Sequence, residues 1–142
     1  MFGEKYIIGK TDTTMEEKRR ICLPKFTHAE PGDEVVLRAF YSENDTYLKI
    51  TGYHEFFEMI EKVREFRDTA TTMDEYNKLN LKLEYMCRQL DAALTIDKQR
   101  RLLIPVHITE QLNWYPYDQF DMEGLGTSLL IRKRKPNTTK KP

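Results

Sequence analysis

Two short stretches of this sequence carry the residues best suited to binding an anion. One reads TMEEKRRICLP (residues 14–24) and the other TIDKQRRLLIP (residues 95–105). In both, an acid is followed three residues later by two arginines, an apolar triplet and a proline. A single offset of 81 positions, that of Arg101 from Arg20, aligns the two stretches without a gap. The match predicts an internal repeat of one supersecondary unit.

The repeated arginines predict a contact with DNA, because a guanidinium can donate two parallel hydrogen bonds to a phosphate or to the O6/N7 edge of guanine. A single Arg-Arg pair before a strand is usually a solvated edge, but its duplication favours binding. We expect the acids to hold the loops by accepting hydrogen bonds from the backbone or from arginine. The expected loop-structuring acids are Glu16 and Asp97. The expected DNA-binding residues are Arg20 and Arg101 as motif arginines, with Lys18, Arg19, Lys98 and Arg100 beside them.

Charge is distributed unevenly along the 142 residues. The last twelve hold six basic residues and no acid, which leaves 17 basic against 23 acidic residues elsewhere, a net charge of −6. An acidic body argues against coating nucleic acid by bulk charge, so DNA binding would depend on the two arginine loops and the tail. The tail has no apolar positions to bury, and its composition predicts disorder over residues 134–142.

Other kinds of site find no support in the sequence. The three histidines are scattered and lack neighbouring cysteines, so we expect no metal and no cofactor. Phosphate-binding glycine loops and nucleophile elbows are absent, and no enzyme is predicted. No apolar run is long enough to span a membrane, and two cysteines without partner spacing fit a reducing cytoplasm.

The secondary-structure signals predict an α+β fold with β-rich ends. Short strands are expected at residues 6–9, 21–23, 35–40 and 47–50, and again at 93–96, 102–104 and 128–132. The segment between the last two of these strands is predicted as a connection with one helical turn, broken by Pro116. Between the β-rich ends, apolar spacing predicts a helix over residues 54–67 and a second one whose seam runs Tyr76, Leu79, Leu83, Met86, Leu90. Thr72 followed by Glu75 predicts a capping box at its start.

The doubled motif, "MEEKRRICLP" and "IDKQRRLLIP", resembles the MraZ family within the SpoVT-AbrB superfamily. The likeness extends over roughly residues 5–132 and includes "YLKITGYHEFFEMIEKV". It implies two tandem AbrB-like swapped-hairpin units, β-barrel-like, with a helical hairpin between them. The expected division is residues 5–67 for the first unit with its helix, 68–133 for the second helix and unit, and 134–142 for the tail.

Three departures from the family pattern are visible. Arg19 and Arg100 stand where the family usually has glycine, and an arginine at a position that favours positive φ predicts a strained or reshaped loop. Glu16 replaces the usual Asp, and Gln99 replaces the usual Lys. A basic tail takes the place of the helix expected after the last strand.

The resemblance implies a cytoplasmic, nucleoid-associated transcriptional regulator that represses by binding promoter direct repeats of the division and cell-wall genes. Its expected partners are double-stranded DNA and further copies of the same chain, in rings within the family, with no membrane and no small-molecule substrate. A second hypothesis stays open: an oligomeric, antitoxin-like or adaptor module whose arginines bind an acidic protein. A neighbouring gene of toxin size would favour that alternative.

Overall fold

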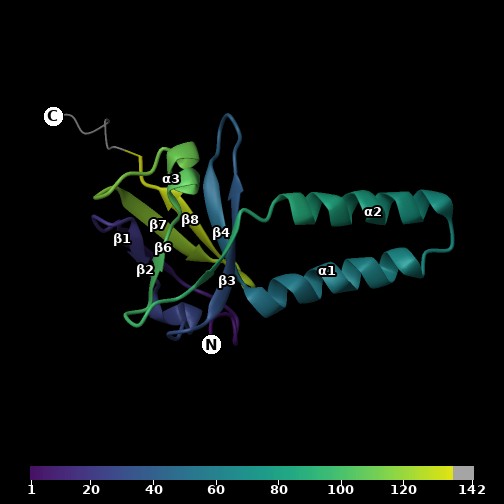
Figure 1. The fold of residues 1–142 in the computed structure, drawn as a ribbon, viewed down its shortest axis with the longest axis horizontal. Helices are drawn as coiled ribbons and strands as arrows, with labels where there is room; N and C mark the ends of the chain where they lie inside the picture. Colours follow the sequence, from purple (N-terminus) through teal and green to yellow (C-terminus); the bar gives the residue numbers. More distant parts are fainter. Residues whose placement is uncertain (136–142) are drawn as a thin grey trace.

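Strands from both ends of the chain build one sheet. The computed structural model describes residues 1–135, so most of the predicted tail, residues 136–142, lies outside the described part. The six-stranded antiparallel sheet has the order β1-β7-β8-β4-β3-β5, and β2 and β6 form a separate two-stranded ribbon (Figure 1). The strands are β1 (Lys10–Thr14), β2 (Arg20–Cys22), β3 (Glu34–Phe40), β4 (Tyr47–Gly52), β5 (Ala92–Thr95), β6 (Arg101–Leu103), β7 (Gln119–Gly124) and β8 (Ser128–Lys133).

The sequence repeat appears in the sheets as an internal pseudo-twofold. In the ribbon, Ile21 pairs with Leu102, and these positions are 81 residues apart. In the large sheet, Lys49 of β4 pairs with Leu130 of β8, which are also 81 residues apart. The counterparts in the two halves are β1 and β5, β3 and β7, and β4 and β8. When each strand is exchanged for its counterpart, the strand order reads the same from either edge of the sheet. The repeat is therefore two interleaved halves around one axis.

This interleaving corrects the expected barrel-like form, while the expected domain division stays a prediction. The expected boundary at residues 67/68 falls at the last residue of the first long helix, and the halves on either side share one sheet and one hydrophobic core. The sheet has two edge strands, β1 and β5, so in residues 1–135 it does not close into the barrel-like form that was expected. The coarser prediction, an α+β protein with a helical hairpin between β-rich ends, is confirmed.

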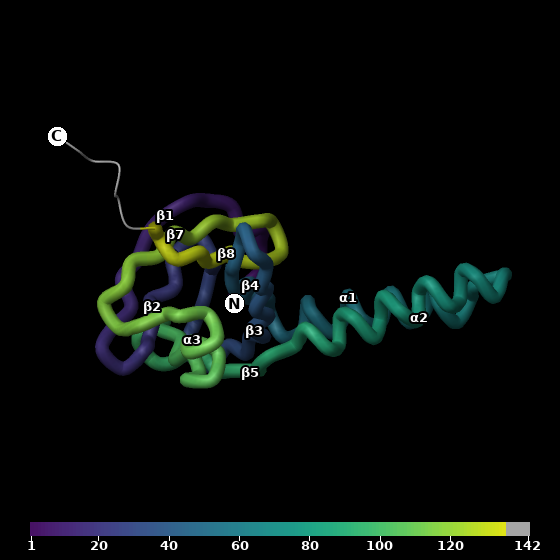
Figure 2. Tube along the Cα trace, turned by 90° about the horizontal axis from the view of Figure 1, so that it is seen from above, coloured from purple at the N-terminus to yellow at the C-terminus, as the bar shows by residue number. Residues whose placement is uncertain are grey.

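The helical hairpin projects away from the body of the protein. It consists of α1 (Tyr53–Asp68) and α2 (Met73–Arg88), which run side by side in both views (Figures 1 and 2). The predicted cap is present, since the Glu75 backbone N–H donates to Thr72 Oγ1 at 3.1 Å. No helix in the described range is both long and apolar enough to cross a membrane.

A buried arginine anchors the base of the hairpin to the sheet. Arg38 of β3 places its guanidinium over the ring of Phe56 in α1, 5.1 Å from the centroid. It also donates to Thr51 Oγ1 at 3.2 Å, and Thr51 shares a hydrogen bond with Ser128 of β8. Burial lowers the pKa of Arg38 from its ordinary value. The first turn of α1 is thereby tied to the central strands.

Two strand predictions were wrong. The first strand covers the polar segment Lys10–Thr14 and not residues 6–9, of which only Ile7 forms a bridge, with Gly126. The segment predicted as a connection contains α3 (Val106–Leu112) and then β7, where the buried Phe120 and Met122 alternate with the exposed Gln119 and Asp121. Edge pairing with β7 orders β1 although β1 has no apolar residue to bury.

Candidate nucleic-acid interface

The β2–β6 ribbon brings the two repeated motifs together. Ile21 and Leu102 are fully buried at its centre and join the main core. Because side chains alternate along a strand, the residues on either side of this pair face outward. Arg20 pairs with Leu103, and Cys22 pairs with Arg101. The two motif arginines therefore lie on one outward face, on the part of the body away from the helical hairpin (Figures 1 and 2).

The two charged loops that precede the ribbon strands have the same backbone geometry. In the first, the Glu16 N–H donates to Arg20 O and the Arg19 N–H donates to Glu16 O, both at 2.9 Å. Asp97, Arg100 and Arg101 repeat both bonds in the second loop, at 3.0 and 3.1 Å. Each loop also accepts a backbone bond from the opposite motif, so the ribbon and its loops form one unit.

Arginine occupies the left-handed region in both loops. Arg19 has φ 61° and Arg100 has φ 58°, where glycine is normally favoured. The turn is thus kept with arginine in the glycine position, and a non-glycine residue there costs on the order of 1 kcal/mol. Arg19 Nε is buried without a hydrogen-bond partner among the described residues, while Arg100 Nε donates to Ala29 O at 3.2 Å.

The two motif arginines differ in their partners. Arg101 donates from Nε to Asp97 Oδ2 at 3.1 Å and from Nη1 to Glu16 Oε1 at 2.9 Å, and its side chain is 20% exposed. The Arg20 guanidinium makes no hydrogen bond or ion pair with any residue in the range 1–135. Lys18 and Lys98 are exposed beside them. The loop residues 16–20 and 97–101 together hold six bases and three acids, a net charge of +3.

Asp97 holds its loop by accepting backbone bonds. Its Oδ1 accepts from the N–H groups of Gln99 and Arg101, each at 2.8 Å. Burial alone would raise the pKa of Asp97, but these two bonds and the Arg101 guanidinium outweigh burial, so the pKa lies below its ordinary value.

A pH dependence of stability follows from this lowered pKa. A carboxylate with a depressed folded-state pKa stabilises the fold above its unfolded value, about 3.9, and loses that contribution as pH falls through the folded pKa. We expect Asp97→Asn to lower the free energy of unfolding at pH 6, and the gap from wild type to shrink below about pH 4. Urea unfolding between pH 2.5 and pH 6 measures this difference in the free energy of unfolding. The variant Glu17→Gln, at an exposed acid of the other loop, is the control. A gap that stayed constant with pH would contradict the assignment.

Cys22 is a surface residue that the sequence analysis did not place at the site. It lies between the motif arginines on the outward face, and its Sγ is 3.8 Å from Glu16 Oε2. Burial and the Glu16 carboxylate raise the pKa of the Cys22 thiol. The alternation of its strand, with buried Ile21 and Leu23 on either side, could have indicated that Cys22 faces outward.

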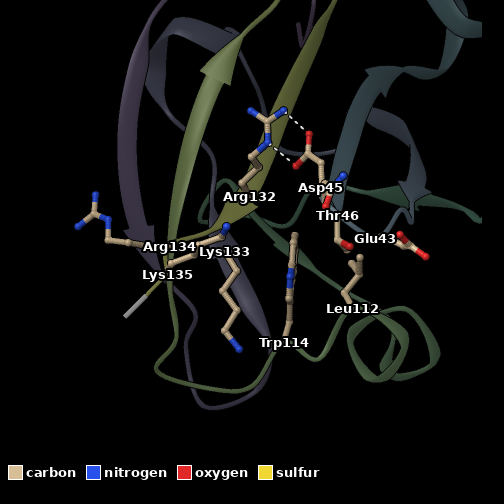
Figure 3. Close-up of a pocket in the computed structure, with 10 residues that line it drawn as sticks. Glu43, Asp45, Thr46, Leu112, Trp114, Arg132, Lys133, Arg134 and Lys135 are labelled. Carbon is tan, nitrogen blue, oxygen red and sulfur yellow. Dashed lines mark hydrogen bonds and ion pairs between the residues drawn. The ribbon is translucent and has the colours of Figure 1, made fainter. Parts of the chain in front are cut away.

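The basic residues near the C-terminus are paired with acids. Arg132 binds both carboxylate oxygens of Asp45, at 2.8 and 2.9 Å, beside a cavity of about 430 Å³ (Figure 3). Lys133 pairs with Asp118, and Arg134, which was assigned to the tail, pairs with Asp121 and Asp12. These partners neutralise three charges of the segment, so the described part of the tail offers less free positive charge than the ribbon.

Comparisons with known proteins do not assign the chain to a family. No family model matches it, and no curated protein matches it. Among solved structures, it is similar to the solution structure of PHS018 from Pyrococcus horikoshii, at 15% identity and a TM-score of 0.42 over 94% of this chain and 98% of that chain. Similarity at this level does not establish a shared function. The resemblance to the MraZ family remains a prediction.

Proposed function

We propose that this protein is a transcriptional regulator that binds double-stranded DNA at promoter direct repeats through the outward face of the β2–β6 ribbon. The observation that carries the proposal is the placement of both repeated arginine motifs on one two-stranded ribbon related by a pseudo-twofold. A two-stranded ribbon fits the major groove of B-DNA, where an arginine can read guanine. Occupying a promoter in this way would block polymerase and repress transcription, in the cytoplasm and at the nucleoid.

The charge of the ribbon supports this proposal. The chain as a whole has no net charge, whereas the two loops hold a surplus of three positive charges. Lys18, Arg20 and Lys98 have no acidic partner among residues 1–135 and can contact phosphates without first breaking an ion pair. Local positive charge of this kind supplies the salt-dependent part of DNA affinity.

The interleaved halves also support the finer fold proposal of two fused AbrB-like swapped-hairpin units. Each half contributes a ribbon strand and a hairpin, β3–β4 or β7–β8, and the outer strand of each hairpin pairs with a strand of the other half. A chain built in this way presents two loops with the same backbone geometry, and an assembly of several copies would present them at regular spacing along repeated DNA sites.

The proposal predicts that specific DNA will cover Cys22. Duplexes from the region upstream of the protein's own gene, and shuffled duplexes of equal length, are titrated by fluorescence anisotropy. We expect tighter binding of the upstream duplex and slower alkylation of Cys22 when it is bound. Cys87, which is exposed on α2, is the internal reference. Equal affinity for both duplexes, or unchanged Cys22 alkylation at saturation, would contradict the proposal.

One observation favours the alternative function, a module that binds an acidic protein. Lys18, Arg20 and Lys98 have no acidic partner among residues 1–135, and such cations bind the carboxylates of a protein as well as phosphates. The same titration with an acidic peptide in place of DNA separates the two functions. Binding of the peptide without any preference among duplexes would favour the protein partner.

We further propose that copies of the chain associate through the helical hairpin. Leu81 and Tyr85 lie one turn apart on α2 and are 66% and 60% exposed, and Phe66 and Met73 are also exposed near the tip. Exposed apolar residues gathered on one projecting element are typical of an interaction surface. Sedimentation velocity should show an oligomer that the double change Leu81→Lys and Tyr85→Lys reduces in size. The control is Asn44→Lys, at an exposed polar residue outside the helices, and an equal effect of control and test would contradict this interface.

A further inference from the structure

The two copies of the acid-arginine motif are chemically unequal, and the difference begins with the acid. In the second copy, Asp97 bonds to its own loop, accepting from the N–H groups of Gln99 and Arg101 and from Arg101 Nε. A short carboxylate accepts in this way from backbone groups a few residues further along the chain. The second loop is therefore closed by its own acid.

In the first copy the acid is Glu16, whose side chain is one methylene longer. It makes none of the corresponding bonds with its own loop in residues 1–135. Its carboxylate reaches across the ribbon to Arg101 Nη1, at 2.9 Å. Arg101 thus binds the acids of both copies, and no carboxylate is left for Arg20.

We infer that Glu16 divides the repeated arginines into a held residue, Arg101, which ties the two loops together, and a free residue, Arg20, which contacts the DNA. The inference rests on the proposed function and concerns which half of the repeat reads the ligand. The donors of Arg101 that bind Asp97 and Glu16 cannot also form a guanine contact, and breaking charge-assisted bonds opposes such a contact. Arg20 has all five of its donors available. The pseudo-twofold of the backbone is therefore not a twofold of the binding surface.

The inference gives Glu16→Asp a specific consequence. The shorter carboxylate can accept from its own loop, the N–H groups of Lys18 and Arg20 and the Arg20 guanidinium, as Asp97 does in the other copy. Arg101 then loses one carboxylate while Arg20 gains one. The substitution keeps the net charge and removes one methylene, so a change in which arginine is available reflects the reach of the acid.

Arginine modification by phenylglyoxal, followed by mass spectrometry, tests this division without DNA. In the wild-type protein we expect Arg20 to react several-fold faster than Arg101, with exposed Arg64 as the reference. In Glu16→Asp, the Arg20 rate should fall and the Arg101 rate should rise. Equal rates in the wild-type protein, or rates that Glu16→Asp leaves unchanged, would overturn the inference.

DNA titrations of Arg20→Ala, Arg20→Lys and Arg101→Ala complete the test. Arg20→Ala should weaken binding of the upstream duplex roughly 10-fold or more. Arg20→Lys should lose less affinity than Arg20→Ala, because lysine can still pair with a phosphate but cannot form the bidentate contact with guanine. Arg101→Ala should weaken binding less than Arg20→Ala at temperatures where circular dichroism shows both variants folded. Equal losses would overturn the division and leave the proposed function intact. If no duplex is preferred while the modification rates still differ, the proposed function fails and the division of the arginines stands.

Discussion

Replacing Leu102 with alanine should destabilise the protein by about 2–5 kcal/mol. Leu102 is fully buried and pairs with Ile21 at the centre of the β2–β6 ribbon, where the pseudo-twofold passes. The three-residue strands leave few other side chains to hold the ribbon on the core. Removal of this side chain takes away buried apolar surface and leaves a cavity that the paired strands cannot easily close.

The matched control for Leu102→Ala is its neighbour Leu103→Ala. Leu103 is in the same strand but is 52% exposed on the outward face. Its replacement should change the free energy of unfolding by no more than about 0.5 kcal/mol. Urea unfolding at one pH compares the two variants with wild type. Equal losses would mean that the ribbon is not packed on the core as described.

Replacing Trp114 with alanine should have the larger effect on stability, about 3–5 kcal/mol. The indole is 1% exposed and its ring centroid lies 4.5 Å from that of Phe120 in β7. The Trp114 backbone N–H donates to Thr109 O at 2.9 Å, directly after α3, so this side chain connects the helix to the sheet. We expect the variant to lose much of its cooperative thermal transition.

The neighbouring Tyr115→Ala is the control for Trp114→Ala. Tyr115 is 52% exposed, and the Lys133 ammonium lies over its ring, 5.7 Å from the ring centroid. An exposed cation–π contact contributes about 0.5–1 kcal/mol, so the loss should be no larger. A Trp114→Ala variant as stable as Tyr115→Ala would contradict the packing assigned to this region.

Much of the architecture could be predicted because its signals are local. The helical spacing of Phe56, Ile60 and Val63 predicted α1, and the strands β3, β4 and β8 were predicted from short apolar runs with turn residues between them. β1 could not be predicted in this way, because its KTDTT sequence is ordered by pairing with β7 and not by burial. The alternation of Phe120 and Met122 is a strand signal and the nearby Pro116 is a signal for a connection, and pairing with β1 and β8 makes this segment a strand.

The sequence repeat predicted two matching arginine motifs, but not that they would lie on one ribbon or how they would interact. The two loops match in backbone geometry, including the left-handed Arg19 and Arg100. The bond between Glu16 and Arg101 joins residues 85 positions apart and depends on the interleaved arrangement of the halves. A linear comparison of the motifs treats Arg20 and Arg101 as equivalent, whereas the antiparallel ribbon allows one acid to cross to the other copy.

The most direct test of the proposal that the β2–β6 ribbon binds DNA is the salt dependence of affinity in two charge-matched variants. One carries Lys18→Ala and Arg20→Ala on the ribbon side, and the other carries Lys78→Ala and Lys82→Ala on the exposed side of α2. Affinity decreases with salt, and the magnitude of the slope of log K against log salt decreases by about 0.9 for each phosphate that the protein no longer neutralises. We expect the slope of the ribbon variant to fall by about 2 and its preference for the upstream duplex to disappear, whereas the helix variant should keep both. Equal slopes and equal affinities in the two variants would show that DNA does not bind at the ribbon.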